Sequence, residues 1–308
     1  MTKRAFEGVY SLLLTPFHAD LSIDWSGYER YLAWQLGHGP DGLFAVCGSS
    51  EMKWLEPGER LELARRAVRA SDGVPVVATA NLGVDPAGHG DEVARMADTG
   101  VAAVVLVPPD GMGEDQERLG AYLAETIDAA PCPAILYEWP AVKPHLVDAD
   151  VYGELVRGHH LAGIKDTTCT LDGITAKIAQ TAGATVFQAN APFMLPSIRH
   201  GARGIMAIVT TAAADMAIAF WRAAMAERDH GSGADVEALH ELLVLLDCTL
   251  GRAGAYPATA KHLAAVRGVP TGRACRSGAA APAEALEAVA VWYRQARRGG
   301  RLAEPVED

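Results

Sequence analysis

The 308-residue sequence lacks the segments that direct a chain into or across a membrane. Residues 1–9 include two basic side chains, but no apolar run long enough for a signal peptide follows them. No uncharged apolar stretch reaches the roughly eighteen residues of a membrane helix. The best candidate, residues 207–221, is interrupted by Asp215. We therefore expect a cytoplasmic protein with no membrane partner.

The sequence also lacks the cysteine and histidine spacings that are typical of disulfide frameworks and metal sites. Its five cysteines are odd in number and lie far apart, at Cys47, Cys132, Cys169, Cys248 and Cys275. This distribution fits neither a disulfide framework nor a pair of zinc ligands, and no two-histidine spacing accompanies it. We expect reduced thiols, no metal and no cofactor.

Positive charge is in deficit, since 27 lysines and arginines face 38 acidic residues for a net charge of -11. A nucleic acid or an anionic membrane needs a basic face, so neither is expected as a partner. Half of the residues are hydrophobic and 21% are charged, which is enough apolar material for a large core. The length is one at which single (β/α)₈ barrels are common.

Short apolar runs rich in β-forming residues recur along the first two-thirds of the chain. They cover residues 9–15, 42–47, 74–80, 101–107, 133–139, 161–165, 185–189 and 204–209. Successive residues in these runs are apolar instead of alternating with polar ones. This pattern predicts parallel strands that are covered on both faces.

Between the runs lie amphipathic stretches that open with cap-type residues or an early proline. They include residues 25–36, 57–70, 86–99, 114–129 and 148–157. Eight alternations of strand and helix predict a closed (β/α)₈ barrel, or TIM barrel, over residues 1–225. An open doubly wound sheet is the alternative, but residues 15–17 read Thr-Pro-Phe where a dinucleotide-binding sheet has a glycine-rich turn.

The remainder of the chain has only helical patterns, at residues 216–228, 236–250, 257–267 and 282–297. No further strand run follows the eighth. We expect residues 226–308 to form a C-terminal helical extension that packs on the barrel.

A barrel of this kind carries its active site at the carboxyl ends of its strands. Lys165 closes the apolar run 161–165, where burial makes an uncompensated ammonium costly and lowers its pKa. A lysine so placed can be a neutral amine at pH 7 that attacks a ketone. A structural ion pair with Glu51, Glu138 or Asp166 is the alternative.

Other polar residues follow neighbouring strands. Tyr137 lies near the end of the preceding run, 133–139, and could shuttle a proton to and from a carbinolamine, although an aromatic cap of the core is the alternative. Gly48, Ser49 and Ser50 follow the second run, and their hydroxyl and N–H groups could bind a carboxylate. The same Gly-Ser-Ser segment is also a common turn signal.

Five segments together resemble a known family. They are residues 8–17, 41–51, 107–109, 137–140 and 163–168. In their order and spacing the sequence is similar to the dihydrodipicolinate synthase / N-acetylneuraminate lyase family over nearly the whole chain, including residues 257–261 of the tail. The twenty-eight positions from Tyr137 to Lys165 match the family's separation of tyrosine and lysine.

The resemblance implies a lyase of the class I aldolase type. Lys165 would form a Schiff base with pyruvate or another 2-oxo acid, and Tyr137 would move the proton. Ser49 would be the third catalytic residue. Together with Gly48 and Ser50 it would also hold the carboxylate of the oxo acid. The resemblance further implies an aldehyde as the second substrate and a homo-oligomer, either a dimer or a tetramer.

The sequence departs from the family in the turn after the second strand. The family commonly reads Gly-Thr-Thr-Gly-Glu, whereas counting back from Glu51 places Gly48 at the first threonine and Ser49 at the second. If the loop slides by one residue, Ser49 and Ser50 replace both threonines. We expect Glu51 to be a structural carboxylate that fixes this turn.

The site of the second substrate departs further. Residues 108–112 lack the paired tyrosines of dihydrodipicolinate synthase. The arginine that binds the second carboxylate in that enzyme is also absent after residues 137–140, and Lys143 could replace it only as a point charge. Production of the lysine precursor is therefore not expected. We expect Glu138, Asn190 and Ile205, near the ends of three strands, to contact substrate.

Three alternatives stay open. A dehydratase acting on a sugar-derived 2-oxo acid would use the same Schiff base. A barrel without turnover would only bind 2-oxo acids. A metal-dependent barrel would use Glu51, Glu138, Asp166 and a histidine such as His18, but it would leave Lys165 unexplained.

Overall fold

Eight parallel strands close into a barrel in a computed structural model that describes residues 6–138, 146–159, 161–269 and 271–303. The strands pair in chain order, and β1 also pairs with β8. They are β1 (Gly8–Leu12), β2 (Gly42–Val46), β3 (Val76–Thr79), β4 (Ala103–Leu106), β5 (Ala134–Tyr137), β6 (Gly163–Asp166), β7 (Thr185–Gln188) and β8 (Gly204–Ile205). The prediction of a (β/α)₈ barrel is confirmed.

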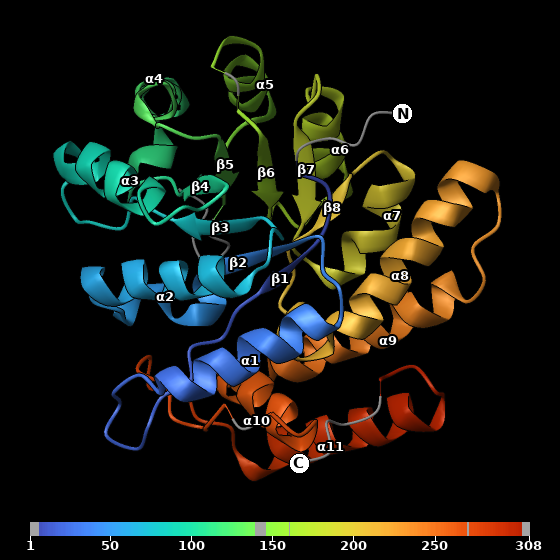
Figure 1. Ribbon diagram of the computed structural model, residues 1–308. Helices are drawn as coiled ribbons and strands as arrows, with labels where there is room; N and C mark the ends of the chain where they lie inside the picture. The colour runs from blue at the N-terminus through green and yellow to red at the C-terminus, as the bar shows by residue number, and fades with distance from the viewer. Residues whose placement is uncertain (1–5, 139–145, 160, 270, 304–308) are drawn as a thin grey trace.

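Helices surround the barrel, and each strand is followed by one (Figure 1). The barrel helices are α1 (Trp25–Gly37), α2 (Pro57–Ala70), α3 (His89–Ala97), α4 (Gln116–Ala129), α5 (Ala149–Gly158), α6 (Leu171–Ala179), α7 (Met194–Arg199) and α8 (Thr210–His230). The tail adds α9 (Val236–Leu250), α10 (Ala258–Val266) and α11 (Ala283–Arg298). The predicted helical extension is therefore present.

The strands are shorter than the apolar runs that predicted them. The run 204–209 extends past β8 because Thr210 and Thr211 donate their N–H groups to Ala207 and Ile208, so the chain already turns into α8 there. Apolar residues in these turns are buried like strand residues, and composition does not separate the two. The end of the run 133–139 lies outside the described residues.

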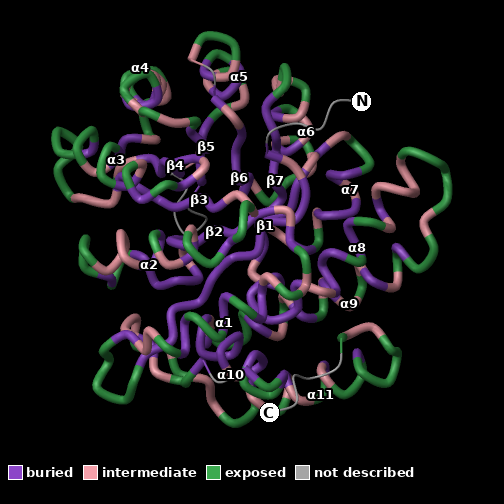
Figure 2. The backbone as a smooth tube through the Cα atoms, in the orientation of Figure 1, coloured by how far each residue is buried: buried purple, intermediate pink, exposed green. Residues whose placement is uncertain are grey.

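The strands are buried along their length (Figure 2). Tyr10 and Phe187 meet edge to face with ring centroids 5.1 Å apart. A Cβ at Gly42 would lie 2.2 Å from the Tyr10 ring, and one at Gly204 would lie 2.2 Å from the Phe187 ring. Glycine at these two positions makes room for the two rings.

The helical extension packs along one side of the barrel, where α9 and α10 contact α8 and α11 contacts both α9 and α10 (Figure 1). Arg267, which follows α10, pairs with Asp215 of α8 at 2.7 Å. Lys261 of α10 reaches Glu51 at the carboxyl end of β2, 2.8 Å away. The extension is thereby tied to the end of the barrel that holds the candidate site. None of the helices in the described part of the chain is long and apolar enough to cross a membrane.

Candidate active site

The register of β5 and β6 brings Tyr137 and Lys165 together. The two residues are directly paired on neighbouring strands, and both are buried. Lys165 Nζ lies 4.0 Å from the centre of the Tyr137 ring and 5.5 Å from that of Phe44. The rings of Phe44 and Tyr137 also meet edge to face, 5.8 Å apart. Lys165 is therefore enclosed by aromatic rings from β2 and β5.

Lys165 has no ion pair with any carboxylate in the described residues. Burial, opposed by a weaker influence of Cys47, lowers the pKa of Lys165 to about 8. The proton is thus held less tightly than on an ordinary lysine, and the neutral fraction of the amine rises from about a tenth at pH 7 to about half at pH 8. A neutral amine is the form that can attack a carbonyl carbon.

The carboxylates that were the alternative partners of Lys165 are bound by other lysines. Lys177 of α6 contacts Glu138 at 2.5 Å and Asp166 at 3.0 Å. Because successive strand residues point to opposite faces, Glu138 and Asp166 lie on the face opposite to Tyr137 and Lys165. They point toward the helix layer, where Lys177 completes the ion pairs.

Glu138 has three partners in this outer cluster. Its carboxylate accepts hydrogen bonds from the N–H groups of Val147 and Thr167, both at 2.9 Å, besides the Lys177 ammonium. Although burial lowers the pKa of Lys177, the charges of Glu138 and Asp166 outweigh it, and the net pKa is raised. These contacts let Glu138 hold the strand ends in place, and the substrate contact that the sequence suggests for it stays a prediction.

The turn after β2 forms the short helix η1 (Gly48–Ser50). The Ser50 hydroxyl is occupied, since its one proton lies between the carbonyls of Leu13 and Ala45, 2.7 and 2.8 Å away, and its oxygen accepts from the N–H of Cys47. The Ser50 hydroxyl is thus engaged by the backbone, and its contact with substrate stays a prediction from the sequence. The N–H groups of Gly48 and Ser49 have no acceptor within the described residues, so this turn presents two backbone donors.

Glu51 fixes the turn through contacts with the helical extension. It adopts a left-handed backbone with φ of 61°, and its buried carboxylate accepts from Lys261 and from the N–H of Ser277, both at 2.8 Å. These contacts agree with the prediction of a structural carboxylate. They also separate Glu51 from the cluster of Glu138 and Asp166. Nowhere in the described ranges do three or more side chains of the metal-binding types form a group that could hold a metal.

Tyr256 is a site residue that the sequence did not suggest. It lies two positions before the first residue of α10, and its hydroxyl oxygen is 2.5 Å from Ser49 Oγ. The only signal for it in the sequence is its position next to the tail segment 257–261, which carries part of the family resemblance. The extension thus contributes a side chain to the same turn that presents the backbone donors.

Asn190 and Ile205 lie at neighbouring strand ends. Asn190 follows β7 and donates its backbone N–H to Gln188 Oε1 at 2.8 Å. Ile205 ends β8, is fully buried and pairs in register with Gln188. Both residues are at the carboxyl end of the barrel, as the strand assignment predicted.

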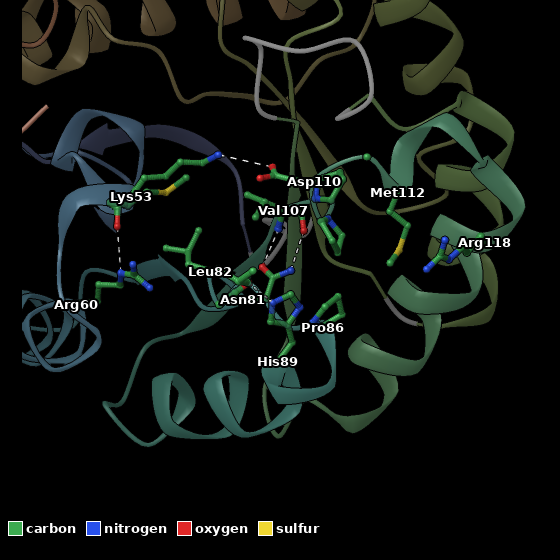
Figure 3. A pocket seen from close by; sticks show the side chains of 16 residues that line it. Lys53, Arg60, Asn81, Leu82, Pro86, His89, Val107, Asp110, Met112 and Arg118 are labelled. Atoms are coloured by element: carbon green, nitrogen blue, oxygen red, sulfur yellow. Dashed lines mark hydrogen bonds and ion pairs between the residues drawn. The ribbon is translucent and has the colours of Figure 1, made fainter.

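A cavity of about 540 Å³ opens beside the site, over the ends of β3 and β4 (Figure 3). Lys53 and Asp110 lie on its wall with charged atoms 3.7 Å apart, and Arg60 donates to the Met52 carbonyl at 3.0 Å. Lys165 and Tyr137 do not line this cavity. Met52 and Lys53 follow Glu51 in the chain, so the cavity adjoins the turn that holds Ser49.

A buried lysine at the strand ends of such a barrel, with no carboxylate partner among the described residues, is an arrangement from which an amine can attack a carbonyl carbon. Residues 5–289 match the model of the dihydrodipicolinate synthetase family, and the chain belongs to that family. A 4-hydroxy-tetrahydrodipicolinate synthase of Moorella thermoacetica is 27% identical over 86% of this chain and 89% of the relative. A probable 5-dehydro-4-deoxyglucarate dehydratase of Saccharopolyspora erythraea is 29% identical over 75% of this chain and 74% of the relative.

Solved structures share the fold. YagE of Escherichia coli, a family member crystallised with pyruvate, superposes with a TM-score of 0.84 at 21% identity, over 96% of this chain and 98% of its own. CdNal of Clostridium difficile, crystallised with mannosamine, gives a TM-score of 0.83 at 19% identity, over 94% and 99%. Since the sequence relatives are named as synthases and a dehydratase of one family, this chain is an enzyme of the lyase type.

Proposed function

We propose that the protein is a class I aldolase-type lyase in which Lys165 forms a Schiff base with pyruvate or another 2-oxo acid. The observation that carries this proposal is the environment of Lys165, which is buried beside Tyr137 with no described carboxylate as partner. A lysine that only stabilised the fold would need such a partner. YagE, which shares the fold, was crystallised with pyruvate, and this supports the choice of substrate class.

In the proposed reaction the neutral amine of Lys165 adds to the C2 carbonyl, and the carbinolamine then loses water to give an imine. Protonation of the imine nitrogen withdraws electrons from C2. A proton or an aldehyde can then leave C3, and the electron pair is held as an enamine. The enamine either takes up an aldehyde to form a carbon–carbon bond or is protonated and hydrolysed to release the 2-oxo acid and Lys165.

Tyr137 is the proposed proton shuttle. Burial, with a smaller influence of Cys47, raises the pKa of Tyr137, so the phenol is protonated at neutral pH and can act first as an acid. It lies against the Lys165 amine and would serve the loss of water from the carbinolamine. Ser49 and the N–H groups of Gly48 and Ser49 would hold the carboxylate of the oxo acid, with Ile205 and Asn190 as further contacts.

A second candidate function is dehydration of a sugar-derived 2-oxo acid by the same Schiff base. The relative named as a probable 5-dehydro-4-deoxyglucarate dehydratase favours it. Both reactions pass through an enamine. They differ in what leaves, which is an aldehyde in aldol cleavage and a hydroxyl group, released as water, in dehydration.

We further propose that the protein is cytoplasmic and works as a homo-oligomer, either a dimer or a tetramer.

Borohydride reduction in the presence of pyruvate, followed by peptide mass spectrometry, tests the proposal. We expect a reduced pyruvyl adduct on Lys165 and none on the peptides that contain Lys177 or Lys261, which serve as internal controls. The adduct should be absent from Lys165→Ala. If several 2-oxo acids leave Lys165 unmodified in the folded wild-type protein, the proposal is wrong.

Exchange of the C3 protons of pyruvate for deuterium separates an enzyme from a barrel that only binds. Exchange requires removal of a proton from C3, so a barrel without turnover would form the adduct and show no exchange. Analysis of products from 2-oxo sugar acids by NMR then distinguishes release of an aldehyde from loss of water.

A further inference from the structure

The contact between Tyr256 and Ser49 joins two parts of the chain that are 207 positions apart. Tyr256 belongs to the helical extension, while Ser49 lies in the turn after β2. Their hydroxyl oxygens are 2.5 Å apart, which is short for a hydrogen bond between two hydroxyls. The geometry brings a tail residue directly to the turn that presents the free backbone donors.

The direction of this hydrogen bond follows from the acidity of the two groups. A phenol is the stronger acid, so Tyr256 donates and Ser49 Oγ accepts. Ser49 is 2% exposed and has no other hydrogen bond within the described residues. Its own proton is therefore left to donate to a third group, in contrast to Ser50, whose hydroxyl already has three backbone partners.

Burial raises the pKa of Tyr256 well above its ordinary value, although the hydrogen bond with Ser49 opposes this. The phenol consequently stays protonated and remains a donor throughout the neutral range. Thr211, at the start of α8, also lies within hydrogen-bonding reach of the Tyr256 hydroxyl. The tyrosine is thus held between the barrel and the turn.

We propose that Tyr256 is a positioning residue that directs the Ser49 hydroxyl proton onto the carboxylate of the 2-oxo acid bound at Lys165. By occupying the Ser49 oxygen, Tyr256 leaves the serine only one useful role, that of donor to the ligand. The hydroxyl then acts together with the N–H groups of Gly48 and Ser49. This inference rests on the proposed function. It explains the selectivity of the site for a carboxylate by a residue of the helical extension.

The test compares Tyr256→Phe with the wild type by trapping Lys165 with borohydride at increasing concentrations of pyruvate or of its neutral methyl ester. We expect Tyr256→Phe to raise the pyruvate concentration for half-maximal trapping by about five- to tenfold, since a hydrogen bond to a charged group is lost or misdirected. The concentration for methyl pyruvate should change by less than about twofold. A general loss of structure would shift both.

Tyr28→Phe is the matched control, because Tyr28 is a buried tyrosine whose hydroxyl donates to the Leu63 carbonyl and not to Ser49. This variant should trap both ligands as the wild type does. In a Ser49→Ala background, Tyr256→Phe should cause no further loss for pyruvate, because the tyrosine acts through the serine. Additive losses from the two substitutions would overturn the inference.

The outcomes separate this inference from the proposed function. If wild-type Lys165 forms no adduct with any oxo acid, the Schiff-base function fails. If the wild type forms the adduct and Tyr256→Phe has the same preference for pyruvate over the ester, only the positioning role of Tyr256 fails.

Discussion

Two buried lysines lie on opposite sides of the β5–β6 strand pair, and their surroundings differ in kind. Lys165 is 4% exposed and Lys177 is 3% exposed, so the two lose water to the same extent. Lys177 faces two carboxylates, and its pKa is raised. Lys165 faces aromatic rings, and its pKa is lowered to about 8. Burial alone does not determine the charge of a lysine; the groups that replace water determine it.

This comparison assigns separate tasks to the two faces of the sheet. The outer face, with Glu138, Asp166 and Lys177, holds the strand ends through a closed set of ion pairs. On the inner face, none of the described residues gives Lys165 a counter-charge. The chemistry that we propose needs that arrangement, because an amine bound to a carboxylate would stay protonated.

The largest effect is expected when the lysines are removed one at a time and activity is measured. Lys165→Met should lower the exchange of pyruvate C3 protons by at least about a thousandfold, because no other group can form the imine. Lys177→Met should lose activity only in proportion to the fraction that unfolds. If the two variants lost similar activity per folded molecule, the contrast drawn between Lys165 and Lys177 would be wrong. Circular dichroism supplies the folded fraction.

The next effect concerns stability on the outer face. Lys177→Met should reduce the free energy of unfolding by about 3–5 kcal/mol, because it leaves Glu138 and Asp166 buried without a cation. A urea titration measures this loss. The matched variant Lys177→Met with Glu138→Gln and Asp166→Asn should recover part of it. A loss below about 1 kcal/mol would show that the cluster is not a closed ion-pair network.

Replacing the lysine of the inner face should instead raise the free energy of unfolding. The folded-state pKa of Lys165, about 8, lies below its ordinary value of 10.5, so the folded state binds its proton less well than the unfolded state. The resulting cost to stability is present in full below pH 8 and disappears as the pH rises to about 10.5. Lys165→Met should therefore raise the free energy of unfolding by roughly 2–3 kcal/mol at pH 7.

Unfolding titrations of this variant and the wild type at pH 7 and pH 10 test the sign. The difference between the two proteins should shrink at the higher pH. A loss of stability at pH 7 would mean that the Lys165 ammonium has a partner that compensates for its burial.

The smallest effect is the pH dependence of imine formation. Only the neutral amine attacks the carbonyl, so the initial rate with pyruvate should rise about tenfold per pH unit below 8 and level off above it. Stopped-flow trapping measures the rate. A rise that continues to pH 10 would give Lys165 the pKa of an ordinary exposed lysine.

Much of the fold could be predicted from the sequence because barrel strands covered on both faces leave continuous apolar runs. The burial of Lys165 could also be predicted, because Lys165 ends such a run, but the sequence left open whether Glu51, Glu138 or Asp166 pairs with it. The contacts that Glu138 and Ser50 make could not be predicted. Tyr137 and Glu138 are adjacent, so strand alternation allows only one of them to face the barrel interior, and the sequence alone does not tell which.

Contacts between segments that are distant in the sequence could not be predicted, for a different reason. Lys177 meets Glu138 across 39 positions, and Tyr256 meets Ser49 across 207. Local patterns encode helix and strand periods, but they do not encode which side chains meet after the barrel closes. Lys177 looks like an ordinary polar residue of an amphipathic helix, and Tyr256 looks like an aromatic residue in a loop.

The most direct test of the two-lysine account is the pH dependence of reductive trapping with pyruvate and cyanoborohydride, read for each lysine in one peptide digest. The account predicts an adduct on Lys165 that grows with a midpoint near pH 8, and none on Lys177 at any pH that leaves the protein folded. An adduct on Lys177, or modification of Lys165 only near the ordinary pKa of lysine, would contradict it.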